Sequence, residues 1–151
     1  MYLRELKLGA KLLYGDDILS AIPEEPITTL DLIQRTRFDI VMALAALLSY
    51  RSGDVGTAMD EFTKSCLYGV RSLVILQSRV FPIGYEKIYS ASIELVKDKD
   101  CKKVIDAAMA YRRNKVNPEI DLMYENIDLL DSFIEPKVIR AFQKNGVTDL
   151  V

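Results

Sequence analysis

Helical periodicity is the feature that most constrains the fold of this chain. Between residues 28 and 146, apolar side chains recur at intervals of three and four residues, the spacing that places them on one face of an α-helix. Glycine, proline and polar turn residues interrupt the pattern. No alternating β-branched run and no Asn-Gly hairpin signal competes with it. The sequence therefore predicts an all-α fold, an up-and-down bundle of four to five helices with a short N-terminal extension.

Signals at helix ends divide this region into five predicted helices. Thr28 or Thr29 caps the first helix, and Asp54 caps the second. The fifth helix is expected to start at Asn117 as the cap, with Pro118 at its first position, and to bend at Pro136. A charged turn at residues 97–100 is expected to separate the third helix from the fourth. The predicted helices cover roughly residues 29–52, 55–81, 85–96, 101–114 and 118–145.

Two long helices carry the clearest faces. The run Ile40–Leu48 is apolar all round, as expected of a helix that is buried on several sides. The apolar positions of this first helix are Phe38, Val41, Met42, Ala45 and Leu48. The apolar face of the second helix holds Val55, Met59, Phe62, Cys66, Val70, Leu73 and Gln77. Its other face holds Asp60, Glu61, Lys64, Tyr68 and Arg71. Gly69 within this helix indicates a close approach to a neighbouring helix.

Residues 1–26 differ from the rest of the chain. Their leucines fit neither a clean helical stripe nor an alternation, so we expect one or two helical turns and then a short extended piece that ends at Gly15. Pro23 and Pro26 then break the chain. The predicted organisation is an N-terminal extension and linker at residues 1–26, followed by a helical bundle domain at residues 27–151.

Composition excludes several classes of enzyme. The chain of 151 residues has no histidine, so His-dependent triads, HExxH zinc sites and the Cys/His deaminase site are ruled out. The net charge of −2 gives no general attraction to DNA or an anionic membrane. Cys66 and Cys101 are predicted to be reduced, buried thiols. Asp16 and Asp17 lack a third metal ligand, and Asp16 is expected to cap a turn. We expect a cytoplasmic protein with no metal, no cofactor and no membrane span.

Two clusters of side chains are candidate binding residues. Arg112 and Arg113 lie with Lys115 near the end of the fourth predicted helix, where they could hold a phosphate together with the helix N-terminus that opens at Pro118. The alternative is that these cations only complement the helix macrodipole. On the second helix, Lys64, Tyr68 and Arg71 form one stripe that could bind a planar or anionic ligand. The alternative there is a solvated face on which Asp60 pairs with Lys64.

Two segments resemble known families. Leu6–Leu19, with its Leu-Tyr-Gly sequence followed by Asp, is similar to the junction of small nucleotidyltransferases of the polymerase-β superfamily, where the catalytic domain leads into a helical domain. The region from Thr28 onward resembles the HEPN and kanamycin-nucleotidyltransferase C-terminal helical domains. HEPN proteins carry an R-x-x-x-x-H motif on a late helix, and residues 112–117 match its first residue and its length.

The chain also departs from both families. The superfamily's catalytic signature, Gly-Ser followed by paired Asp residues, does not occur in the sequence, so the chain is not a complete nucleotidyltransferase. It could be a separated helical half, a fragment, or a descendant without the catalytic half. Asn117 stands where HEPN ribonucleases have their histidine, and an amide neither takes nor gives a proton. The chain is therefore not expected to be an enzyme on its own.

The function expected from this resemblance is a non-catalytic helical domain that binds a nucleotide or substrate in association with a nucleotidyltransferase. Its groove would be lined by Tyr68, Arg71, Tyr111 and Arg112, with Lys64, Arg113 and Asn117 as further candidate ligand residues. The resemblance also implies a homodimer through the long helices and a nucleotidyltransferase catalytic chain as a partner. The alternative is a helical interaction or oligomerisation module without a ligand. A HEPN-type ribonuclease is the third reading, which the missing histidine disfavours.

Overall fold

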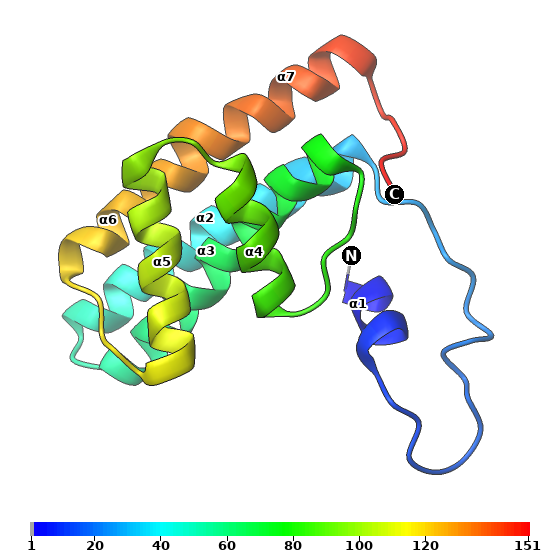
Figure 1. The fold of residues 1–151 in the computed structure, drawn as a ribbon, viewed down its shortest axis with the longest axis horizontal. Coiled ribbons are helices and arrows are strands. Elements are labelled where there is room, and N and C mark those ends of the chain that lie inside the picture. Colours follow the sequence, from blue (N-terminus) through cyan, green and yellow to red (C-terminus); the bar gives the residue numbers. More distant parts are fainter. Residues whose placement is uncertain (1) are drawn as a thin grey trace.

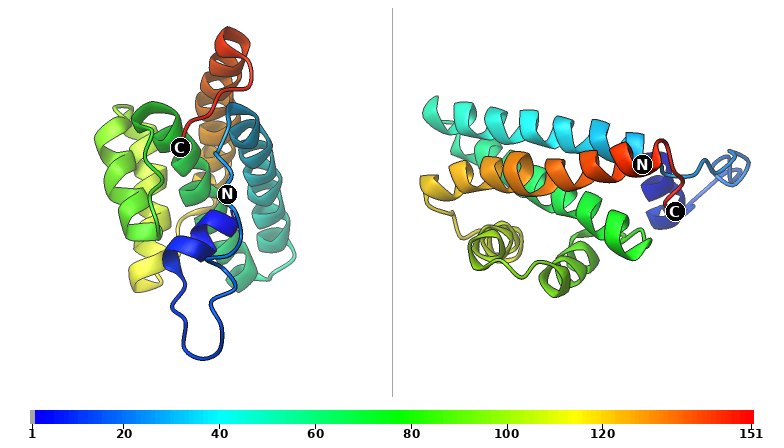
Figure 2. Two further views of the ribbon diagram at one scale, coloured as in Figure 1. Left: turned by 90° about the vertical axis from the view of Figure 1, so that its right-hand side faces the viewer. Right: turned by 90° about the horizontal axis from the view of Figure 1, so that it is seen from above.

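The elements in a computed structural model that describes residues 2–151 are α1 (Tyr2–Gly9), α2 (Thr29–Arg51), α3 (Val55–Ser78), α4 (Tyr85–Leu95), α5 (Lys99–Asn114), α6 (Ile120–Asp128), a π-helical segment η1 (Leu129–Ile134) and α7 (Glu135–Asn145). Helix α2 runs antiparallel to α3 and to the rod formed by α6 and α7, while α4 and α5 lie across α3 (Figure 1 and Figure 2). The prediction of an all-α, up-and-down fold is confirmed. Within the described residues, pairing between extended segments is limited to an isolated antiparallel bridge between Thr28 and Asp149.

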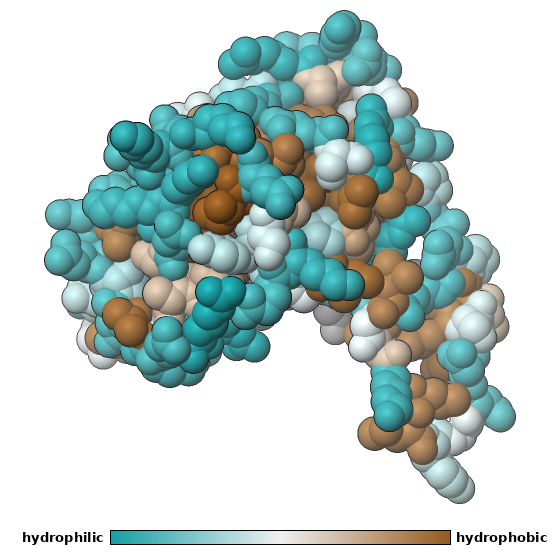
Figure 3. Space-filling model, in the orientation of Figure 1, coloured by the Kyte–Doolittle hydropathy of each residue, from teal (hydrophilic) through white to brown (hydrophobic). Residues whose placement is uncertain are grey.

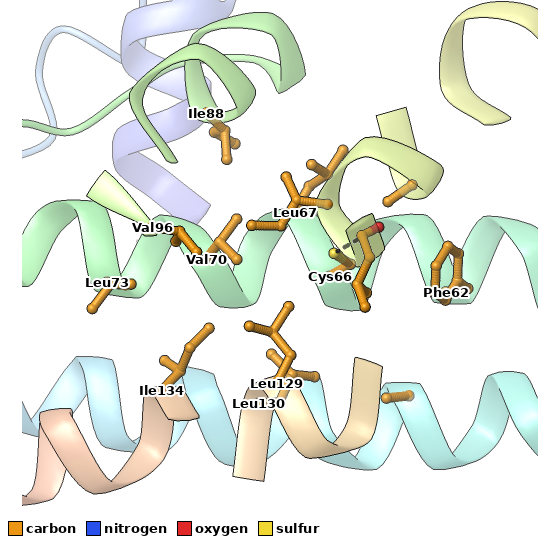
Figure 4. Packing of buried hydrophobic residues seen from close by; sticks show 14 of the residues in the cluster. Phe62, Cys66, Leu67, Val70, Leu73, Ile88, Val96, Leu129, Leu130 and Ile134 are labelled. Atoms are coloured by element: carbon orange, nitrogen blue, oxygen red, sulfur yellow. Dashed lines mark hydrogen bonds between the residues drawn. The ribbon is translucent and has the colours of Figure 1, made fainter. Parts of the chain in front are cut away.

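Helix α3 lies at the centre of the bundle. It contacts α2 and the α6–η1–α7 rod as well as α4 and α5. Figure 2 shows α4 and α5 on the side of α3 that faces away from α2. Figure 4 shows the same arrangement at the side-chain level, with Leu130 and Ile134 on one side of α3 and Ile88 of α4 on the other. Because α3 has neighbours on nearly every side, it is buried over most of its length.

The starts of the two long helices were predicted correctly. Thr28 and Asp31 form a capping box, in which the Asp31 backbone N–H donates to Thr28 Oγ1 at 3.2 Å and the Thr28 N–H donates to Asp31 Oδ2 at 2.8 Å. Asp54 Oδ1 accepts from the Thr57 N–H at 3.1 Å. Each cap satisfies N–H groups that have no partner within the helix.

Two later helix starts were predicted wrongly. The expected charged turn at residues 97–100 is only half a turn, because Asp98 caps α5 by accepting from the Cys101 N–H at 2.9 Å and the helix already includes Lys99 and Asp100. Asn117 does not cap α6, which begins only at Ile120. The reason lies one turn earlier: Lys115 adopts a left-handed conformation with φ of 56°, which ends α5 and leaves Asn117 in an exposed loop.

The expected bend near Pro136 takes the form of the π-helical segment η1. Proline has no N–H to donate to the preceding turn, and α7 starts just before it, at Glu135. Segment η1 occupies the six residues immediately upstream and buries Leu129, Leu130 and Ile134. The rod therefore continues past the proline with a change of helix type rather than a break.

The predicted apolar face of α3 is confirmed in its central part. Met59, Phe62, Cys66, Val70 and Leu73 are all buried there. Gly69 marks the expected close approach, because a Cβ atom at this position would lie 2.0 Å from Leu130 Cδ2. Arg71 corrects the prediction for the other face: it is buried, not solvated.

The predicted apolar face of α2 is wrong. Phe38, Val41 and Leu48 are exposed, and the buried face consists of Thr29, Leu32, Ile33, Thr36, Asp39, Ala43, Ala46 and Leu47. The helix is apolar on all sides between residues 40 and 48, so periodicity alone does not select the inner face. Contacts with α3 and the α6–η1–α7 rod select the side with small and polar residues, which permits close packing.

The N-terminal segment lies at the edge of the bundle. Helix α1 confirms the expected helical turns, and residues 10–26 that follow have turns but no helix or strand. Asp17, rather than Asp16, accepts from a turn N–H, that of Ser20, at 3.2 Å. Leu12, Leu13 and Tyr14 are exposed, and this segment carries apolar surface at the lower right of Figure 3.

Candidate functional site

A cluster of arginine and tyrosine side chains lies where α2, α3 and α4 meet. Tyr68 of α3 is its centre. The guanidinium of Arg35 from α2 lies 4.8 Å from the centroid of the Tyr68 ring, and that of Arg71 from α3 lies 4.4 Å from it. Both distances are within the range of cation–π attraction, so the ring holds two positive charges close together.

Arg35 is paired with a buried carboxylate on its own helix. Its Nε donates to Asp39 Oδ2 at 3.0 Å and its Nη2 donates to Asp39 Oδ1 at 2.7 Å. Burial raises the pKa of Asp39 to about 7, against the opposing effects of the Arg35 charge and hydrogen bonds and of the Arg71 charge. The Asp39 carboxyl therefore changes charge near neutral pH.

Arg71 is the most unusual member of the cluster. It is only 1% exposed, and its Nη1 lies 3.2 Å from Oε2 of Glu5, which belongs to α1. This ion pair does not count as a hydrogen bond, and within the described part of the chain neither Nε nor Nη1 of Arg71 has a hydrogen-bond partner. The Phe81 ring lies 5.0 Å from the guanidinium. A buried guanidinium with unused donors is energetically expensive unless another group satisfies it.

The aromatic surface continues from α3 to α4 and α5. The rings of Tyr68 and Tyr85 are 5.5 Å apart, and the Arg112 guanidinium lies 4.8 Å from the Tyr85 centroid. Burial, with a smaller effect of the hydrogen bond to Tyr85, raises the pKa of Tyr68 further above its ordinary value. Tyr68 therefore remains a neutral phenol at physiological pH, and this row of side chains supplies cations and ring faces but no general base.

The structure brings together only some of the predicted binding residues. Tyr68, Arg71 and Arg112 belong to the connected row described above. Lys64 is exposed one turn away along α3, and no ion pair with Asp60 forms among the described side chains. Tyr111 is buried in the core.

The predicted phosphate site at the end of α5 does not form as expected. Arg113 is bound to both carboxylate oxygens of Glu86, with its Nε 3.0 Å from Oε1, and this pair lowers the pKa of Glu86. Asn117 lies in the loop, and no helix N-terminus opens at Pro118, because α6 starts at Ile120. Arg112 and Asn117 therefore lie on different segments, whereas the resemblance to the HEPN motif would require both on one helix.

Sequence reasoning missed four members of the cluster: Glu5, Arg35, Asp39 and Tyr85. Arg35 and Asp39 had a usable signal, because a cation and a carboxylate four residues apart lie on one helix face. Glu5 and Tyr85 had none, since their partners are far away in the sequence.

Among residues 2–151, no group of three or more histidine, cysteine or acidic side chains is placed to hold a metal ion. Both cysteines are free, but Cys101 is only partly buried. Burial raises the pKa of the Cys66 thiol, and burial with an Asp98 hydrogen bond raises the pKa of Cys101 to about 12. None of the described helices is long and apolar enough to cross a membrane.

Comparison of the chain with protein-family models, curated proteins and solved structures finds no match. The case for a function therefore depends on the exposed surfaces and the charged cluster of this molecule.

Proposed function

We propose that this chain is a helical self-association module that forms a homodimer through α2. One observation carries the proposal: a row of large apolar side chains, here named the α2 stripe, is exposed along one face of this helix. The α2 stripe consists of Leu30 (40% exposed), Phe38 (53%), Val41 (61%), Leu44 (46%) and Leu48 (67%). It extends over about 27 Å of helix. Exposed Gln34 and Arg37 separate Leu30 from the other four residues, and an exposed apolar cluster of this kind is typical of protein interaction sites.

The spacing of the α2 stripe suits a second copy of the same helix. When two identical helices pack antiparallel about a two-fold axis, residues opposite one another have numbers with a constant sum. An axis at residue 43 places Phe38 opposite Leu48, Val41 opposite Ala45 and Leu44 opposite Met42 of the other copy. Ala45 is a small residue on the same side and would allow the two helices to approach closely.

Two arginines lie beside the apolar residues of the α2 stripe and are bound within the chain, Arg37 by a carboxylate and Arg51 by a neutral hydroxyl. Arg37 Nε donates to Glu135 Oε1 at 2.8 Å, and Arg51 Nη2 donates to the Tyr124 hydroxyl at 3.2 Å. Two copies would therefore meet through apolar side chains bordered by groups already bound within each chain. This is the usual anatomy of an interface, with an apolar centre and a polar rim.

Replacing Leu44 by arginine tests this proposal. The change should weaken the dimer at least about 100-fold, because it places two guanidiniums close to the two-fold axis, a loss of about 2.7 kcal/mol. Light scattering at micromolar concentration should show a dimer for the wild type and a monomer of unchanged helicity for L44R. Val147→Arg is the matched control, since Val147 is 61% exposed but lies outside α2. A monomeric wild type, or a dimer that survives L44R, would refute the proposal.

A second candidate function is binding of a nucleotide or substrate beside a nucleotidyltransferase, as the family resemblance implies. The observation that favours it is the row formed by Arg112, Tyr85 and Tyr68, in which an exposed guanidinium lies over a ring. Such a surface can stack a base and bind a phosphate. Ribonuclease activity is not proposed, because the Asn117 amide is neither an acid nor a base near neutral pH and lies off the helix that carries Arg112.

The nucleotide candidate predicts a thermal shift. With ATP, GTP or CTP at about 2 mM, with and without magnesium, a dissociation constant near 0.1 mM should raise the melting temperature by about 5 °C. Arg112→Gln should abolish the shift, whereas Arg140→Gln, a change at an exposed arginine on α7, should preserve it. If none of the nucleotides shifts the melting temperature of the wild type, the nucleotide candidate is rejected.

A further inference from the structure

We infer that Arg71 is an anion-binding site that the Glu5 carboxylate fills in this structure, and that a phosphate group takes the place of Glu5 when α1 moves away. The site is separate from the α2 stripe. The inference rests on the nucleotide candidate only where the ligand is a nucleotide, whose phosphate would then lie at Arg71. Free phosphate would bind in the same way.

The burial of Arg71 is the first argument. Its side chain is 2% exposed, while that of Glu5, whose carboxylate is 3.2 Å away, is 23% exposed, so Glu5 is the more accessible partner of the pair. Nε and Nη1 of Arg71 make no hydrogen bond to any residue that the structure describes. The other nearby carboxylate, Asp39, is engaged by two hydrogen bonds from Arg35. Arg71 therefore retains donors for an anion that approaches from the side on which Glu5 now lies.

The surroundings of Arg71 suit a phosphate better than a carboxylate. The rings of Tyr68 and Phe81 border the guanidinium and exclude water, which strengthens its attraction for an anion. Arg35 lies over the same Tyr68 ring and adds a second positive charge nearby when its partner Asp39 is protonated. A phosphate group brings more negative charge and more acceptor oxygens than Glu5 does, so it can use donors that Glu5 leaves unpaired.

Helix α1 is held loosely enough to be displaced. Apart from the Glu5–Arg71 pair, the polar contacts of its described side chains go to the chain terminus and to the following segment. Arg4 Nη1 donates to the Val151 carbonyl at 2.6 Å and Arg4 Nη2 pairs with Glu24 at 3.7 Å, and Lys7 donates to the Ile22 carbonyl. Figures 1 and 2 show α1 at the edge of the bundle. A helix of eight residues has little stability of its own in water.

Glu5 acts as an internal competitor under this proposal. The observed affinity for phosphate equals the intrinsic affinity multiplied by the fraction of molecules in which Glu5 has left Arg71. Removing the Glu5 charge should therefore tighten phosphate binding, whereas removing the Arg71 charge should abolish it.

Calorimetric titration with inorganic phosphate tests the site in the full chain. Glu5→Gln should bind phosphate about tenfold more tightly than the wild type, a difference of about 1.4 kcal/mol. Arg71→Met, which keeps most of the side-chain volume, should not bind it. Arg71→Lys serves if the Met variant fails to fold, and should bind at least tenfold more weakly than the wild type. Equal affinity in the wild type and Glu5→Gln, or binding unchanged by both Arg71 variants, would overturn the proposal.

Limited proteolysis supplies a readout that a purely structural Arg71 would not give. Phosphate should speed trypsin cleavage after Lys7 in the wild type, because it frees α1. In Glu5→Gln, cleavage should already be fast without phosphate. Protection of Lys7 by phosphate would contradict the displacement of α1.

Two further arms separate this proposal from the nucleotide candidate. Phosphate binding that depends on Arg71, with no tighter binding of ATP, would support the anion site and reject the nucleotide candidate. ATP binding that depends on Arg112, with phosphate binding indifferent to Arg71, would reject the anion site alone.

Discussion

Replacing Gly69 by alanine is expected to lower the free energy of unfolding by about 2 kcal/mol. The new Cβ would lie 2.0 Å from Cδ2 of Leu130, which is fully buried. Overpacking of this kind typically costs 1–3 kcal/mol and outweighs the roughly 1 kcal/mol by which alanine favours a helix. Urea denaturation followed by circular dichroism measures the change.

Two comparisons show whether the Leu130 contact is the cause. Gly56→Ala on the same helix is the matched control, because a Cβ there meets nothing closer than 3.9 Å, and stability should stay equal or rise slightly. In a double-mutant cycle, Leu130→Ala should be less destabilising in the Gly69→Ala background by at least about 1 kcal/mol. Additive effects of the two changes would show that the strain arises elsewhere.

Replacing Arg35 by methionine should destabilise the protein by about 3 kcal/mol at pH 8 and clearly less at pH 5. In the wild type, the raised pKa of Asp39, about 7, means that the folded state keeps a proton that the unfolded chain has lost. This contribution to stability is complete below the ordinary pKa of aspartate and disappears as the pH rises through 7. Without Arg35, the buried carboxylate loses its partner, so the loss continues to higher pH.

The pH dependence identifies Asp39 as the titrating group. In the double variant Arg35→Met/Asp39→Asn, the side chain at position 39 cannot ionise. The difference between its free energies of unfolding at pH 5 and pH 8 should therefore be much smaller than the difference for Arg35→Met alone. Denaturant titrations at the two pH values measure this directly. An Arg35→Met penalty that is the same at pH 5 and pH 8 would show that Asp39 is not protonated in the folded state.

The fold was largely predictable because its signals are local. The caps at Thr28 and Asp54 and the stop near Gly146 were identified from adjacent residues, and the structure confirms them. The inward face of α2 was not predictable, because that helix is apolar on all sides and only its neighbours decide which side is buried. Lys115 shows the same limit, since its left-handed conformation has no signal of the kind that glycine provides.

The candidate site was predictable only in part, for a related reason. Tyr68 and Arg71 share a helix, so their spacing placed them together, although it suggested that Arg71 was solvated. Their partners come from other helices: Glu5 lies 66 residues before Arg71, and Tyr85 follows a turn after α3. A periodicity argument sees one helix at a time, and this cluster exists only where several helices meet.

The pairing of residues 27–29 with residues 148–151 holds the two ends of the bundle domain next to each other. The Ile27 N–H donates to the Val151 carbonyl at 2.9 Å, and the Leu150 N–H donates to the Ile27 carbonyl at 2.7 Å. A short linker could therefore join residue 151 to residue 27, with new ends opened at the exposed turn between α2 and α3, around Gly53. Such a circular permutant would keep the packing of the bundle helices while leaving out α1, and would present Arg71 without its internal carboxylate.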